Sequence, residues 1–116
     1  MMRIISIITL WLSAALAHTA QLHIGTAETT ITPNRPVALE GYFGLRVSNG
    51  VSSPVMAQVL VLELLEEGKI EERSIMVSAD LVHLPWEMLN AVRDRVGKTL
   101  PEIDTAKIFI STTHTH

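Results

Sequence analysis

The chain has 116 residues, enough for one small domain, since domains commonly run to about 100–150 residues. Hydrophobic residues make up 47 % of it, which is typical of a globular protein and excludes a disordered tail. The net charge of -3, with nine scattered Lys and Arg residues, argues against a nucleic-acid partner, because phosphate backbones are bound by clustered basic side chains. The absence of cysteine excludes a disulfide framework, a zinc–thiolate site and a cysteine nucleophile, so any metal must bind His, Asp, Glu or Tyr.

The first residues are typical of an export signal. Arg3 supplies a positive start, an apolar run extends from Ile4 to Leu16, and Ala15–Ala17 has the small-x-small pattern of a cleavage site. A transmembrane anchor is the alternative, but the run covers only about thirteen residues and a bilayer requires about twenty. We therefore expect a signal peptide at residues 1–17, with cleavage after Ala20 as the second choice. The mature chain should be secreted or periplasmic and should have no integral membrane span.

Four segments carry strand patterns. Leu22–Ile31 is rich in Thr and Ile and is followed by prolines, which predicts a strand and then a turn. Val55–Leu65 is apolar at nearly every position and predicts a buried strand. Glu66–Lys69 should turn the chain, so that Ile70–Ala79 returns antiparallel as the second strand of a hairpin. Ala106–Thr112 contains a short apolar run and predicts another buried strand.

The segments between these strands predict a loop and a helix. Glu40–Pro54 contains several glycines and no sustained periodicity, which indicates a loop that is a candidate to line a site. Pro85 suits the first turn of a helix, and Gly97 suits a C-cap, so the helix should run from Pro85 to Val96. Apolar residues spaced three and four apart should bury one face of it. These are Trp86, Leu89, Val92 and Val96.

Strand, helix and strand over the last part of the chain predict a βαβ unit with a right-handed crossover and parallel strands. The expected fold class is α/β, with a mixed sheet that contains a hairpin and this unit. Asp80 and the terminal segment Ser111–His116 should then lie at the same carboxyl edge of the sheet, where open α/β sheets bind their ligands.

Ser111–His116 is the segment that is dense in catalytic residue types. Alternate residues of an extended chain point the same way, so His114 and His116 can project two imidazoles into one crevice. Neutral imidazole is a common zinc ligand, and the intervening hydroxyls could fix the ring orientations. A catalytic zinc keeps three protein ligands, more than this pair supplies. Spacing alone leaves metal binding and plain solvated histidines evenly balanced.

Other candidate residues have simpler interpretations. Asp80 could be a carboxylate at a metal, but a carboxylate satisfied by backbone N–H groups is commoner and is favoured here. His83 is interpreted as a loop histidine and kept as a candidate because it is close to Asp80. Glu28 and Glu40 have no partner at a meaningful spacing and are interpreted as surface charges.

Four short pieces, in this order, resemble the N-terminal region of the neutral/alkaline non-lysosomal ceramidases. They are Ile24–Ala27 with Ile31–Pro33, Gly41–Tyr42, Val77–Leu81 and Ser111–His116. The likeness runs over nearly all of the mature chain. One departure is Thr30, which stands where the family usually has Asp.

The resemblance implies zinc-dependent hydrolysis of the N-acyl amide of ceramide, giving a sphingoid base and a fatty acid. It implies that His114 is a zinc ligand and that His116 is a catalytic residue, which contacts substrate and stabilises the charged intermediate. The remaining ligands of the family, a second His, a Glu and a Tyr, lie farther downstream. Residues 18–116 would then be the N-terminal part of a larger catalytic domain, inactive alone, whose partners are a lipid amide and, transiently, a membrane surface.

Two other classes remain open. His-x-His at a strand end also begins the sites of amidohydrolases and metallo-β-lactamases, so a different exported metallohydrolase is the first alternative. The second is an exported, non-catalytic binding module whose histidines are incidental.

Overall fold

The computed structural model describes residues 19–116, and the expected signal peptide at residues 1–17 lies outside them. In chain order the elements are β1 (Gln21–Thr30), β2 (Ala38–Leu39), β3 (Arg46–Val47), β4 (Met56–Glu66), β5 (Lys69–Ala79), α1 (Trp86–Thr99), the 3-10 turn η1 (Thr105–Lys107) and β6 (Ile108–Thr112). Within the described range, no helix is long and apolar enough to cross a membrane.

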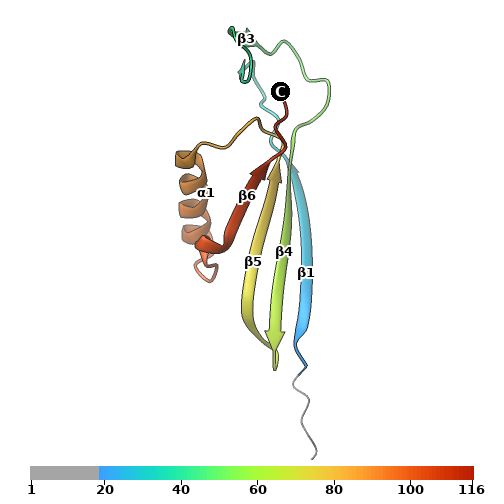
Figure 1. The fold of residues 1–116 in the computed structure, drawn as a ribbon, viewed down its shortest axis with the longest axis vertical. Helices are drawn as coiled ribbons and strands as arrows, with labels where there is room; N and C mark the ends of the chain where they lie inside the picture. Colours follow the sequence, from blue (N-terminus) through green and yellow to red (C-terminus); the bar gives the residue numbers. More distant parts are fainter. Residues whose placement is uncertain (1–18) are drawn as a thin grey trace, which may run out of the picture.

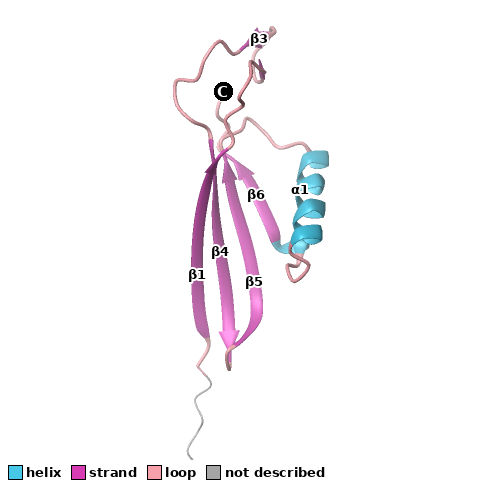
Figure 2. Cartoon of the chain, turned by 180° about the vertical axis from the view of Figure 1, so that it is seen from behind, coloured by secondary structure: helices cyan, strands magenta, loops and turns pink. Residues whose placement is uncertain are grey.

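The main sheet has four strands in the order β1-β4-β5-β6 (Figure 1). β1 pairs antiparallel with β4 and β4 antiparallel with β5, whereas β5 and β6, which precede and follow α1 in the chain, pair with each other in parallel. The predicted α/β class, with a hairpin and a strand–helix–strand unit in one mixed sheet, is therefore confirmed. In Figure 2 the arrows of β5 and β6 end at the same edge of the sheet, where the chain also ends.

The β4–β5 hairpin turns through two residues, as the sequence predicts. Glu67 has φ 51° and Gly68 has φ 76°, so both lie in the left-handed region. Two central residues of positive φ are typical of a type I′ turn, whose twist matches that of the flanking strands. The turn sets the register of the first two pairs, Glu66 with Lys69 and Leu65 with Ile70, and a bulge after Ile70 then shifts the register by one residue, so that Leu64 pairs with Glu72.

Two short strands form a small second sheet, and one of them, β3, lies within the stretch Glu40–Pro54 that was predicted to be a loop. Ala38 pairs with Val47 and Leu39 with Arg46. The backbone N–H of Val37 donates to the Ser48 hydroxyl at 2.9 Å, and the Ser48 N–H donates to the Val37 carbonyl at 2.9 Å. Two residue pairs are too short to leave a periodic signal, so the prediction of an irregular loop was wrong at Arg46–Val47.

The helix continues beyond its predicted end. α1 covers Trp86–Thr99, with Pro85 as its N-cap and Leu100 as its C-cap, so the prediction of Gly97 as the C-cap was wrong. Gly97 lies inside the helix, where an added Cβ would come within 3.2 Å of the Thr105 side chain. The glycine is therefore explained by the close approach of η1, and not by a left-handed helix end.

Burial is lower than the sequence predicts. The buried hydrophobic residues of the described part are Ala79 and Ile108, at 5 % and 2 % exposure. β4 is half-buried, and α1 buries none of its side chains, Trp86 being 65 % exposed. The predictions of two buried strands and a buried helix stripe were thus wrong about burial, except at Ile108 in β6. The reason is visible in Figure 1, where α1 lies to the side of β6 and does not cover the middle of the sheet.

The two faces of the β5–β6 pair differ in exposure. Ile75 pairs with Ile108 on one face, and Met76 with Phe109 on the other, where they remain 44 % and 54 % exposed. We expect Ile108→Ala to lower the free energy of unfolding by about 2 kcal/mol, because it removes buried methyl groups. Phe109→Ala should cost less despite its larger side chain. Urea titrations of both variants measure this, and an equal or reversed loss would contradict the assignment of the faces.

Two ion pairs lie across neighbouring elements of the sheet. Arg73 Nε lies 2.6 Å from Glu63 Oε1 and connects β5 with β4. Lys107 Nζ donates to Glu72 Oε1, and this hydrogen bond lowers the pKa of the Glu72 carboxyl and raises the pKa of the Lys107 ammonium. The second pair, between β5 and η1, is solvent-exposed and screened, so it contributes little to the stability of the fold.

Candidate functional site

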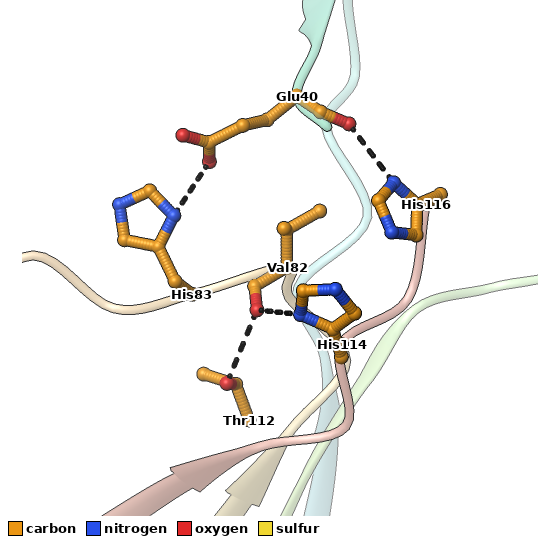
Figure 3. A network of polar contacts seen from close by, with 6 residues as sticks. All are labelled: Glu40, Val82, His83, Thr112, His114 and His116. Atoms are coloured by element: carbon orange, nitrogen blue, oxygen red, sulfur yellow. Dashed lines mark hydrogen bonds and ion pairs between the residues drawn. The ribbon is translucent and has the colours of Figure 1, made fainter. Parts of the chain in front are cut away.

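The residues with metal-binding or catalytic chemistry meet at the carboxyl edge of β5 and β6. His114 and His116 follow β6, Val82 and His83 follow β5, and Glu40 directly follows β2. Figure 3 shows these three segments side by side, with both terminal imidazoles directed to backbone carbonyls. The predicted meeting of the two strand ends at one edge is confirmed by the parallel pairing of β5 with β6.

Asp80 connects three segments at the base of this edge. Its Oδ2 accepts a hydrogen bond from the backbone N–H of Met56 at 2.9 Å, and its Oδ1 accepts one from the Thr113 hydroxyl at 3.0 Å. The Asp80 N–H donates to the Met56 carbonyl at 2.9 Å. The carboxylate is thus satisfied by a backbone N–H, as the favoured interpretation has it, but that N–H belongs to β4 and not to the helix.

His114 is held by the segment that follows β5. Its Nδ1 lies 3.0 Å from the Val82 carbonyl oxygen, which also accepts from the Thr112 hydroxyl at 3.3 Å. His114 has φ 60°, in the left-handed region. Such a backbone costs a non-glycine residue on the order of 1–3 kcal/mol and is found preferentially at functional sites. The expectation that the histidines project from an extended chain was therefore wrong, because the extended conformation ends before His114.

His116 is held by the segment between β2 and β3. Its Nδ1 lies 3.3 Å from the Glu40 carbonyl oxygen, 76 positions away in the sequence. The His114 and His116 rings nevertheless come together, with centroids 4.9 Å apart and an interplanar angle of 87°. The two imidazoles share one site through contacts with separate loops.

These contacts determine where each imidazole carries its proton. A carbonyl oxygen can only accept, so Nδ1 of each ring must be the donor. In the neutral ring the lone pair is then on Nε2. In Figure 3 the Nε2 atoms of His114 and His116 lie on the sides of the rings that face each other. Metal-binding histidines usually show this arrangement, with the second nitrogen donating to a carbonyl or carboxylate.

Within the described part of the chain, the hydroxyls of Thr113 and Thr115 make no hydrogen bond to the imidazole rings. The Thr113 hydroxyl donates to Asp80 and lies 2.9 Å from the Thr115 hydroxyl. The expectation that Ser and Thr orient the imidazoles was wrong, because the backbone carbonyls of Val82 and Glu40 occupy that role.

Glu40 has a larger part in the site than its sequence position suggests. Its Oε2 lies 3.1 Å from His83 Nδ1, and the two side chains are 58 % and 54 % exposed. Glu40 is an exposed charge, as the sequence indicated, but it has a partner, His83, that its spacing does not reveal. The available signal was its position directly before Gly41–Tyr42, one of the four pieces of the family resemblance.

Tyr42 and Arg46 extend the contacts of His116 outward. The Tyr42 ring stands edge-on to the His116 ring, with centroids 5.9 Å apart and an angle of 75°. The Arg46 guanidinium lies over the Tyr42 ring, 4.4 Å from its centroid, at cation–π distance. An aromatic and a cationic side chain therefore border the histidine pair on the side of the β2–β3 sheet.

The described residues supply two candidate metal ligands and not a complete set. Within residues 19–116, no group of three His, Asp or Glu side chains is arranged to hold a metal ion. The donor chemistry of the pair still fits zinc, since both Nε2 lone pairs are left available and imidazole nitrogen is a common zinc ligand. Comparisons of the chain with protein-family models, with curated proteins and with solved structures give no match.

Proposed function

We propose that this chain supplies part of the zinc site of an exported amide hydrolase that cleaves the N-acyl bond of ceramide or a related lipid amide. One observation carries the proposal: His114 and His116 both use Nδ1 to donate to a backbone carbonyl, which leaves two adjacent Nε2 atoms available. The order of the ceramidase-like pieces in the sequence supports the choice of substrate.

The roles of the two histidines follow from their hydrogen bonds. His114 Nε2 would hold the metal, while its Nδ1–H stays on the Val82 carbonyl. Zinc, when bound, lowers the pKa of a bound water and polarises the amide carbonyl. His116 could take up at Nε2 the proton that the attacking water releases, and keep its Nδ1–H bond to the Glu40 carbonyl. As an imidazolium it donates Nε2–H to the negative charge that develops on the amide oxygen.

The turn after β1 is consistent with this resemblance in spite of its one departure. The Thr30 hydroxyl accepts from the backbone N–H of Thr32 at 3.3 Å and lies 2.8 Å from the Thr32 hydroxyl. A carboxylate at this position would make the same local bond to an N–H two residues ahead. Thr30 therefore makes at this turn a local bond that an Asp side chain could also make.

The test is zinc analysis of the intact protein that contains these residues, together with fatty-acid release from ceramide. We expect stoichiometric zinc, hydrolysis that a chelator abolishes, and recovery on adding zinc. Hydrolysis of a β-lactam but not of ceramide would favour the other metallohydrolases. Absence of both stoichiometric zinc and hydrolysis would favour the second alternative, a non-catalytic binding module.

The 116-residue chain alone is expected to be inactive, because a catalytic zinc requires three protein ligands. Fatty-acid release by the purified chain would contradict this part of the proposal.

A further inference from the structure

Glu40 lies between two histidines that come from different strand ends. Its carboxylate contacts His83, three residues beyond Asp80 at the end of β5, at 3.1 Å. Its backbone carbonyl accepts from His116, beyond β6, at 3.3 Å. Figure 3 shows the two contacts leaving Glu40 in opposite directions. A movement of this residue would therefore move the acceptor of His116.

Gly41 brings the backbone close to the same ring. It has φ 89°, a conformation that side-chain-bearing residues rarely adopt. A Cβ built at this position would overlap Nδ1 and Cε1 of His116. Only glycine therefore allows the chain to pass the imidazole at the distance that the Glu40 carbonyl requires.

His114 provides an internal comparison, because it has a separate acceptor. Its Nδ1 donates to Val82, and no hydrogen bond or ion pair among the described residues connects it to Glu40 or Gly41. A change in the β2–β3 segment should consequently affect His116 first.

We propose that Glu40, Gly41 and His83 are positioning residues for His116. His83 holds the Glu40 carboxylate, this contact keeps the Glu40–Gly41 backbone against the imidazole, and the backbone carbonyl fixes the proton on Nδ1. Nε2 of His116 is thereby kept free and directed toward His114. The orientation of the His116 ring follows from contacts within this chain. Its consequence for zinc and substrate rests on the proposed function.

The direct test is the tautomer of each histidine, read from two-bond ¹H–¹⁵N correlations in the metal-free intact protein. We expect His116 in the wild type to carry its proton on Nδ1. Gly41→Ala, Glu40→Ala and His83→Ala should shift His116 toward the tautomer mixture of a solvated imidazole, with His114 unchanged. Glu40→Gln removes the charge of the ion pair with His83 and should shift His116 in the same direction as Glu40→Ala, though less.

Matched variants separate this effect from general damage. Gly44→Ala introduces the same methyl group where nothing lies within 4 Å. Glu28→Ala removes an exposed carboxylate within β1, and His23→Ala removes a histidine of the same strand. All three should leave the His116 signal unchanged. An unaltered His116 tautomer in both Gly41→Ala and Glu40→Ala would overturn the proposal, and so would equal changes at His114 and His116.

Zinc content and amide hydrolysis of the intact protein then test the consequence separately. We expect Gly41→Ala to lower the rate of hydrolysis about 10- to 100-fold with zinc largely retained, because it disturbs His116, the donor to the developing charge, and not His114. Glu40→Ala and His83→Ala should fall toward the lower end of that range. If neither the wild type nor any variant binds zinc, the proposed function fails. The tautomer measurement still decides whether Glu40, Gly41 and His83 position His116.

Discussion

Replacing His114 by alanine in the intact protein is expected to remove bound zinc and to lower amide hydrolysis by about 10³-fold. A catalytic metal contributes several kcal/mol to the transition state, and about 4 kcal/mol corresponds to that factor in rate. The Val82 carbonyl would lose the imidazole that now donates to it. Zinc content and kcat/KM for ceramide are the two measurements.

The backbone of His114 requires a second variant. Alanine is strained at φ 60°, whereas glycine adopts this conformation freely. His114→Gly should therefore show the same loss of zinc and activity with less disturbance of the chain. His23→Ala, in β1, is the control that should retain both. Full activity in His114→Gly would exclude His114 as a metal ligand.

His116→Ala should behave differently from His114→Ala. In the proposed roles it removes a donor to the developing charge and not the first metal ligand. We expect the rate to fall by about 10²- to 10³-fold, as for other oxyanion donors, with zinc largely retained. Loss of zinc equal to that of His114→Ala would assign both imidazoles to the metal.

Asp80→Ala is expected to lower the free energy of unfolding by about 3 kcal/mol, because hydrogen bonds to charged groups contribute roughly 1.5–3 kcal/mol and an orphaned N–H adds to the loss. The substitution removes the acceptor of the Met56 N–H and of the Thr113 hydroxyl, two bonds of 2.9 and 3.0 Å. Urea denaturation of the variant and the wild type measures the difference.

Two further substitutions test whether the loss of stability comes from the hydrogen bonds of the Asp80 carboxylate. Asp80→Asn keeps one acceptor oxygen but places an amide NH₂ opposite one of the two donors, so it should be destabilised as well, though less. Asp94→Ala removes an exposed aspartate of α1 and should have little effect. Equal stability of Asp80→Ala and Asp94→Ala would show that Asp80 does not hold the three segments together.

The elements with strong local signals were predictable from the sequence. Glu67–Gly68 lies between two apolar runs of strand length, which specifies a hairpin without knowledge of the rest of the chain. The order of strand, helix and strand specifies parallel pairing, because such units rarely form otherwise. The end of α1 was not predictable, since Gly97 suits both a helix end and a close contact, and Thr105 decides between them only in three dimensions.

The location of the site in the fold was predictable from the sequence, but the contacts of its side chains were not. The parallel pairing of β5 and β6 brings Asp80 and the histidines to one edge, and this follows from topology. The hydrogen-bond partners of the imidazoles do not follow from topology, because Val82 and Glu40 accept through backbone carbonyls, which every residue has. No side-chain pattern marks such an acceptor, and 76 positions separate Glu40 from His116.

The parallel register of β5 and β6 limits where residues could be gained or lost in this chain. Ala79 lies opposite Thr112, which aligns Asp80 with Thr113 and leaves His114 within reach of the Val82 carbonyl. Deleting one residue within β6 would move everything after it by about 3.3 Å and turn its side chains to the opposite face of the sheet. Deletions between α1 and η1 leave that alignment intact, so length variation is tolerable there and not within β6.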